Sequence, residues 1–181
     1  MTELDEIALV TRALNGDEEA FGDLVDAYGR VIYNLALRMV GDPEDARDLS
    51  QIAFVKAWEK LSTFDRQHRF FSWLYRIALN ECLNFRKRRR VHEPLDVAMP
   101  SHQAGPEASY ERSEESERVQ VAMMRLRAED REVLVLRHFL RLSHREMSEM
   151  MHVPEKTVKS RLHTARVRLE GQLRAQGVEA P

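Results

Sequence analysis

The stretch at residues 142–169, LSHREMSEMMHVPEKTVKSRLHTARVRL, decides how this chain folds. It opens with an S-x-x-E pattern at residues 143–146, in which a serine caps a helix start and a glutamate bonds back to the cap. The sequence HVP at 152–154 then breaks this helix, and Pro154 suits the start of another. The stretch therefore predicts two consecutive helices joined by a tight turn.

The second of these helices has two different faces. Val158, Leu162, Ala165 and Leu169 recur at spacings of four, three and four, so they share one side, which must pack against the preceding helices. Cations and a hydroxyl group lie opposite or on the flank, and such side chains can hold phosphates and reach base edges in the major groove. The candidate DNA-binding residues are Lys156, Lys159, Ser160, His163 and Arg166. From spacing alone, a helical hairpin with a solvated basic face is equally compatible.

The whole stretch resembles region four of bacterial RNA polymerase sigma factors, especially the extracytoplasmic-function (ECF) type. A typical pattern there is L-S-Y-x-E-I-A-x-x-L-G-V-P-x-G-T-V-K-S-R-L-x-R-A-R, and the run TVKSRL at 157–162 is its most specific part. The resemblance implies that Lys159, Ser160 and His163 contact the minus-thirty-five element of a promoter.

Three positions depart from that pattern. His152 and Lys156 replace glycines, and Thr164 stands where an arginine is frequent. His152 must therefore adopt a positive φ or a shifted turn. These departures leave the motif class intact and the base preference open.

The first half of the chain also predicts helices. A helical apolar pattern ends at Gly41, and Asp42 and Pro43 restart a helix as cap and first-turn residue. The apolar pattern consists of Phe21, Leu24, Val25, Tyr28, Ile32, Leu35 and Met39. In the next helix the core-facing residues are Ala46, Leu49, Ala53, Phe54, Ala57, Trp58 and Leu61. Its opposite side carries Ile52 and Val55 among polar residues, as a partner-docking surface would, although a helix buried on both sides would look the same.

This helix resembles sigma region two, where D-A-E-D-L-x-Q-E-x-F-x-x-A-W is typical. The resemblance implies that its outer face binds the clamp helices of the largest subunit of RNA polymerase. The candidate polymerase-binding residues are Asp45, Asp48, Gln51, Ile52 and Val55. Ile52 stands where the family often has glutamate, which could tune that contact.

The sequence RFFSWLYRIALNECLNFRKRRR at 69–90 gives the clearest two-sided pattern. Phe71, Leu74, Ala78, Cys82 and Phe85 form an apolar stripe, and Trp73, Arg76, Asn80, Asn84 and Lys87 line the opposite side. An aromatic ring, two amides and two cations can stack on, hydrogen-bond to and neutralise unpaired DNA. Trp73 packing against a neighbouring helix is the plausible alternative.

The run FSWLYRIALN at 71–80 resembles the family's F-x-x-W-L-Y-R-I-A-x-N. It implies that this helix and the loop before it recognise and open the minus-ten element, with Arg66, His68 and Arg69 as specificity determinants in the loop. The RKRRR tract at 86–90 would grip duplex phosphates, unless it is only a solvated helix end.

Composition agrees with a helical protein of two small domains. The 181 residues are 43% hydrophobic and 32% charged, and only 7 Gly and 6 Pro interrupt them. The net charge of −2 counts against a free-standing DNA-binding domain, but basic residues concentrate in two tracts, as in a protein held on nucleic acid by a larger partner.

Residues 91–117 lack apolar periodicity and are rich in Pro, Ser and Glu. We therefore predict an all-α chain with a region-two domain at 1–92, a flexible acidic linker at 93–117 and a region-four domain at 118–176. In the ECF type the linker threads toward the RNA channel, but a simple tether explains its composition equally well.

Several functions are disfavoured by what the sequence lacks. It has no Gly-rich phosphate loop, H-E-x-x-H motif, paired cysteines or nucleophile elbow, so we expect no catalytic residue, metal site or cofactor. The single cysteine, Cys82, cannot form an internal disulfide and suits the core. No leader or membrane-spanning apolar run is visible, so we expect a cytoplasmic protein that does not insert into membranes.

The resemblance implies an alternative sigma factor that recognises both promoter elements and promotes melting. Its expected partners are core RNA polymerase (the clamp and the flap), promoter DNA in duplex and single-stranded form, and an anti-sigma factor. Two other classes stay open: a stand-alone helix-turn-helix regulator, and a helical interaction protein without a DNA role. The acidic pI and exposed Ile52 and Val55 disfavour the former, and the basic faces disfavour the latter.

Overall fold

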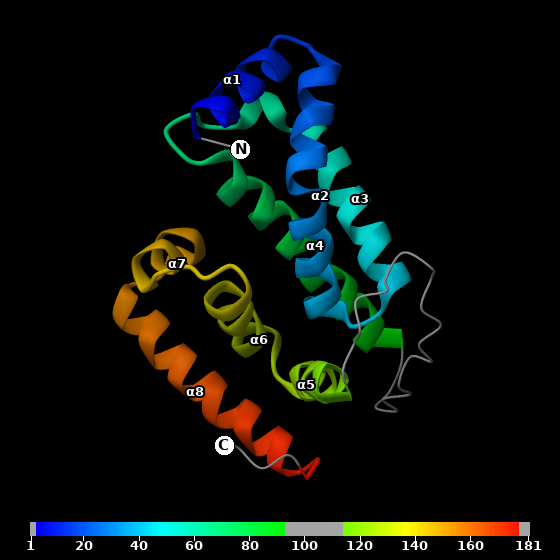
Figure 1. The fold of residues 1–181 in the computed structure, drawn as a ribbon, viewed down its shortest axis with the longest axis vertical. Helices are drawn as coiled ribbons and strands as arrows, with labels where there is room; N and C mark the ends of the chain where they lie inside the picture. The colour runs from blue at the N-terminus through cyan, green and yellow to red at the C-terminus, as the bar shows by residue number, and fades with distance from the viewer. Residues whose placement is uncertain (1–2, 93–113, 178–181) are drawn as a thin grey trace. The chain divides into compact units, whose positions relative to one another are not determined.

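The computed structural model describes residues 3–92 and 114–177, and within these ranges every regular element is helical. The α-helices are α1 Glu3–Leu14, α2 Glu18–Val40, α3 Pro43–Glu59, α4 Phe70–His92, α5 Glu114–Arg125, α6 Ala128–Leu134, α7 His144–Met151 and α8 Glu155–Arg174. A 3-10 turn, Leu61–Thr63, precedes the loop before α4, and a π-helical stretch, Val135–Phe139, continues α6. The predicted all-α fold of two helical domains is confirmed (Figure 1).

The described helices fall into two compact units. The first is built from α1, α2 through Leu37, α3 and α4, and the second from α5 to α8. Residues 93–113, most of the expected linker, lie outside the described residues. Helix α5 begins at Glu114, within the range predicted as linker. Its acidic first turn suits the helix dipole but adds no apolar periodicity, so the sequence pattern did not predict a helix there.

In the first unit, α3 packs along α4 (Figure 1). Asp42 caps α3 as predicted, accepting hydrogen bonds from the backbone N–H groups of Glu44 and Asp45. Gly41 ends the preceding helix with φ +90°. Between the two packed helices, Lys56 of α3 forms a 2.7 Å ion pair with Glu81 of α4, a buried residue.

The core of this unit largely follows the predicted apolar stripes, although Phe71 and Phe85 are only partly buried and Trp58 is exposed. Leu24, Ile32, Leu74, Ala78 and Cys82 are fully buried. Trp58, expected among the core-facing residues, remains 36% exposed. Its ring contacts that of Phe21 in a tilted arrangement, with the ring centroids 4.9 Å apart. The helix ends one residue later, so no further turn covers the indole.

In the second unit, α8 packs against α5, α6 and α7. Val158, Leu162 and Ala165 of α8 are buried in this contact, as their spacing predicts. From α7, Met147 and Met150 are buried on the facing side. Arg131 is completely buried, and its guanidinium donates to the carbonyl oxygens of Met123, Met124 and Leu126 at the end of α5.

Candidate nucleic-acid interfaces

The turn between α7 and α8 has the geometry that its sequence predicts. The Ser143 hydroxyl accepts from the backbone N–H of Glu146 at 3.2 Å, and the Glu146 carboxylate accepts from the backbone N–H of Ser143 at 2.7 Å. His152 closes α7 in the left-handed region, with φ 52°, so the positive φ expected at this position is confirmed. Ser148 donates to the carbonyl oxygen of Val153 at 2.6 Å, which holds the turn. The short helix, turn and longer helix form a helix-turn-helix.

All five candidate DNA-binding residues of α8 are exposed on one side of the second unit. They are Lys156, Lys159, Ser160, His163 and Arg166. The buried face lies opposite Lys156, Ser160 and His163, with Lys159 and Arg166 on the flank, so α8 can enter a major groove without disturbing the core. Val167 also lies on the outer surface, 54% exposed, and offers an apolar contact beside the cations.

Two arginines of α8 are directed to its own unit instead. Arg168 forms a 2.5 Å ion pair with the buried carboxylate of Asp130 on α6. The charge of Arg161 acts on Glu132, also on α6. The sequence reveals these arginines but not the acids that they face, because those acids lie on a separate helix.

A further titratable group, His138, lies in the π-helical stretch near Arg166. Burial, and then the nearby charges of Arg166 and Arg137, lower the pKa of His138. The neutral form of the imidazole is therefore favoured, and His138 adds a polar ring beside Arg166 that the sequence pattern did not predict. Only proximity in the fold reveals it, since His138 precedes the helix-turn-helix.

The outer face of α3 carries four of the five candidate polymerase-binding residues in exposed positions. They are Asp48, Gln51, Ile52 and Val55. Ile52 is 41% exposed and Val55 57% exposed, so this helix is not buried on both sides within its own unit. Two aliphatic side chains exposed side by side are typical of a protein-docking surface.

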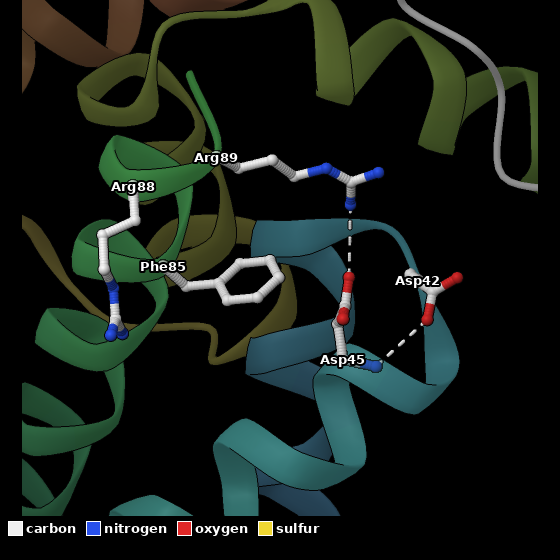
Figure 2. Close-up of a pocket in the computed structure, with 5 residues that line it drawn as sticks. All are labelled: Asp42, Asp45, Phe85, Arg88 and Arg89. Carbon is white, nitrogen blue, oxygen red and sulfur yellow. Dashed lines mark hydrogen bonds and ion pairs between the residues drawn. The ribbon is translucent and has the colours of Figure 1, made fainter. Parts of the chain in front are cut away.

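The fifth candidate, Asp45, is only partly exposed and lines an open hollow between the start of α3 and the end of α4 (Figure 2). Its carboxylate pairs with Arg89 at 3.3 Å. Burial, and then the charge of Asp42, raise the pKa of Asp45, while Arg89 opposes the rise. Arg88 points away from this pair (Figure 2). In the RKRRR tract, Arg89 thus forms an ion pair within its own unit, whereas Lys87 and Arg88 are exposed to solvent.

The polar side of α4 is exposed as predicted at Arg76, Asn80, Asn84 and Lys87. Trp73 is half-buried, with its ring centroid 5.4 Å from Phe64 and 5.7 Å from Phe70. The indole therefore packs against neighbouring rings of its unit, which was the alternative role considered for Trp73. It is not fully buried, so part of the ring stays accessible next to the polar side chains of α4. The three rings make an aromatic cluster at the N-terminal end of α4.

The loop before α4 presents Arg66, His68 and Arg69, all exposed. Asp65 shapes its turn by accepting from the backbone N–H of Gln67 at 2.9 Å, and its carboxylate lies 3.8 Å from the His68 ring. The loop, the aromatic cluster and the polar side of α4 are contiguous. Together they form a surface with the rings, amides and cations that single-stranded DNA binding requires.

These features define a two-domain, all-helical protein with a helix-turn-helix in one domain and an exposed surface of rings, amides and cations in the other. Family models match both: sigma-70 region 2 over residues 24–91 and sigma-70 region 4 over residues 116–169. The chain therefore belongs to the sigma-70 family of RNA polymerase sigma factors, in its ECF type. Members of this family are transcription initiation factors and not enzymes.

Individual relatives agree over nearly the full length. The chain is 32% identical to the ECF RNA polymerase sigma factor SigW of Bacillus subtilis, covering 91% of this chain and 95% of that protein. It is 33% identical to the sigma factor CnrH of Cupriavidus metallidurans, covering 92% and 93%. A solved structure of CnrH in complex with the cytosolic domain of CnrY aligns over 94% of this chain and 98% of that one, with a TM-score of 0.71 and 28% identity.

Within residues 3–92 and 114–177, no helix combines the length and apolarity needed to cross a membrane.

Proposed function

We propose that α8 of this sigma factor reads the minus-thirty-five element through Lys156, Lys159, Ser160, His163 and Arg166. The observation that carries this is the exposure of all five, on the side of α8 opposite its buried residues or on the adjoining flank. Arg161 and Arg168 support the helix from within the unit and are not part of the reading face.

The minus-ten element is the proposed ligand of the first unit. The loop residues Arg66, His68 and Arg69 would select bases, while α4 would stack on and hold the separated strand. On α4 the residues assigned to this are Trp73, Arg76, Asn80, Asn84 and Lys87. Their support is the contiguous exposed surface around the aromatic cluster, since bases stack on rings and cations follow the phosphates.

Core polymerase is the proposed partner of the outer face of α3, with Ile52 and Val55 as apolar contacts and Asp48 and Gln51 as polar ones. Asp45 would join them by exchanging its internal partner, Arg89. The clamp of the largest subunit is the expected site for this face, and the flap for the region-four unit. A protein with these partners would act in the cytoplasm, with the chromosome.

An anti-sigma factor is a further proposed partner. CnrH, a relative, has been solved in complex with the cytosolic domain of CnrY. A partner of this kind would compete for the same exposed side chains of α3 and α8 and would prevent co-purification of this chain with core polymerase.

The decisive experiment is transcription in vitro with core polymerase, with and without this chain, on a library randomised at both promoter elements. The proposal expects initiation only with the chain present and enrichment of two separated motifs. Failure of the purified chain to support initiation, or to bind purified core in the absence of other proteins, would overturn it. Tight binding to one duplex motif without polymerase would instead favour a stand-alone helix-turn-helix regulator.

A further inference from the structure

A buried carboxylate joins three helices of the first unit. Glu6 of α1 is only 6% exposed, and such side chains are rarely buried unless they are paired. One of its oxygens accepts a hydrogen bond from the hydroxyl of Tyr28 on α2. The other accepts from the backbone N–H of Phe70, the first residue of α4, at 3.1 Å. Glu6 precedes residue 24, where the region-2 match begins.

Glu6 supplies a hydrogen-bond acceptor at the start of α4. The first N–H groups of a helix have no acceptor within the helix, and α4 begins directly after Arg69, whose side chain has no acceptor to offer. The carbonyl oxygen of Arg69 accepts from the N–H groups of Ser72 and Trp73, and the N–H of Phe70 needs an acceptor from outside the helix. Glu6 supplies this missing acceptor, and its negative charge complements the helix dipole.

Tyr28 ties this contact to the loop. Its ring lies 5.4 Å from the ring of Phe71, and the charge of Arg69 acts on its hydroxyl. Burial, and then the hydrogen bond to Glu6, raise the pKa of Tyr28 above its ordinary value, so the hydroxyl stays protonated and donates. In Figure 1, α1 lies beside the segment that leads into α4, which is the path of this loop.

The loop is thus held at two points. At one end the Asp65 carboxylate accepts from the N–H of Gln67 and closes a local turn. At the other end the hydrogen bond from Phe70 to Glu6 fixes the first residue of α4 against α1. Arg66, His68 and Arg69 project from the segment between these points.

We propose that Glu6 is a positioning residue for minus-ten recognition, because it fixes the junction of loop and helix α4 through Phe70 and Tyr28 without touching DNA. This inference rests on the proposed role of the loop. Loss of the Glu6 contact would let the loop cations adopt several positions, and selection among bases would decline more than binding of the phosphate chain.

The test uses holoenzyme made from core polymerase and the full chain, on the library randomised at both elements. Glu6→Gln and Tyr28→Phe are compared with Glu19→Gln, an exposed glutamate at the start of α2. We expect both network variants to reduce base discrimination at the minus-ten motif by about tenfold, as for one charge-assisted hydrogen bond to a buried group. Discrimination at the minus-thirty-five motif and the yield of holoenzyme should match the control.

Tyr28→Phe keeps the ring and its packing, so it remains informative if Glu6→Gln folds poorly. The double variant should lose little more than Glu6→Gln alone, since both changes break one network. An unchanged minus-ten profile in both variants, or an equal loss at both promoter elements, would overturn the positioning role. Failure of the wild-type chain to initiate would instead reject the proposed function, so the two failures are distinguishable.

Discussion

The carboxylate of Asp130 on α6 lies 2.5 Å from the guanidinium of Arg168 on α8, the second helix of the helix-turn-helix. Asp130 is buried, whereas the Arg168 side chain is 43% exposed. The pair fixes α8 to the body of its unit. Arg168, a cation of the basic helix α8, therefore has a structural partner.

Replacing Asp130 with Asn should destabilise the second unit by about 1–2 kcal/mol, between the values typical of exposed and buried ion pairs. Both tryptophans, Trp58 and Trp73, lie in the first unit, so their fluorescence does not report on this change. Hydrogen exchange of the α8 amides should accelerate while the fluorescence-detected unfolding of the first unit stays at the wild-type midpoint. A shift of that midpoint alone would contradict the assignment.

The stability of the second unit should fall as the pH rises from about 4.5 to about 7. Burial raises the pKa of Glu132 to about 7, with Arg161 opposing and Glu129 reinforcing the rise. The folded state therefore favours the protonated acid, and this contribution is lost as Glu132 ionises. Glu132→Gln should flatten the pH dependence and slow α8 amide exchange at pH 8. Glu117→Gln, an exposed change on α5, should retain the wild-type slope.

Replacing His152 with Gly should stabilise the helix-turn-helix by about 1 kcal/mol, because His152 occupies a left-handed conformation that costs a side chain about that much. The gain should appear as slower exchange of the amides in α7 and at the start of α8. His152→Ala keeps the penalty and is the matched control. Equal effects of the two substitutions would show that backbone strain does not limit the turn.

Lys159→Ala and Asn80→Ala should produce different promoter defects. Lys159→Ala should weaken holoenzyme binding to duplex carrying the minus-thirty-five motif and, if Lys159 holds a phosphate, lower the slope of affinity against salt by about 1. Asn80→Ala should leave that binding intact and slow promoter opening, measured with a fluorescent base at the minus-ten position. Arg174→Ala, near the end of α8 and paired with Glu170, is the control cation. The same defect from Lys159→Ala and Asn80→Ala would contradict the assignment of two separate surfaces.

The double change Ile52→Ala and Val55→Ala should weaken binding to core polymerase about ten- to a hundredfold, as for loss of two apolar anchors at an interface. Both side chains are exposed, so the thermal midpoint of the first unit should hardly change. Affinity for core can be measured by titration of labelled chain, with Glu59→Gln on the same helix as control. Wild-type affinity in the double variant would place the docking surface elsewhere.

Much of the architecture is determined locally and is therefore readable from the sequence. The Asp42 cap, the capping box at Ser143 and Glu146, and the positive φ at His152 all depend on residues within a few positions of one another. The two faces of α8 follow from helical spacing, since Val158 and Leu162 must turn inward together. Family resemblance then assigned these faces a role that periodicity alone left open.

How distant charges combine depends on the packing of the helices. This packing pairs Asp130 with Arg168, Asp45 with Arg89 and Lys56 with Glu81, and it brings the Glu6 carboxylate to the first residue of α4. None of these pairs follows from spacing, because each joins separate helices whose packing sets the distance. The sequence by itself determined which helices form and which faces carry charge. Packing determined which of those charges remain available for DNA and polymerase, since a buried carboxylate must find a partner wherever the fold supplies one.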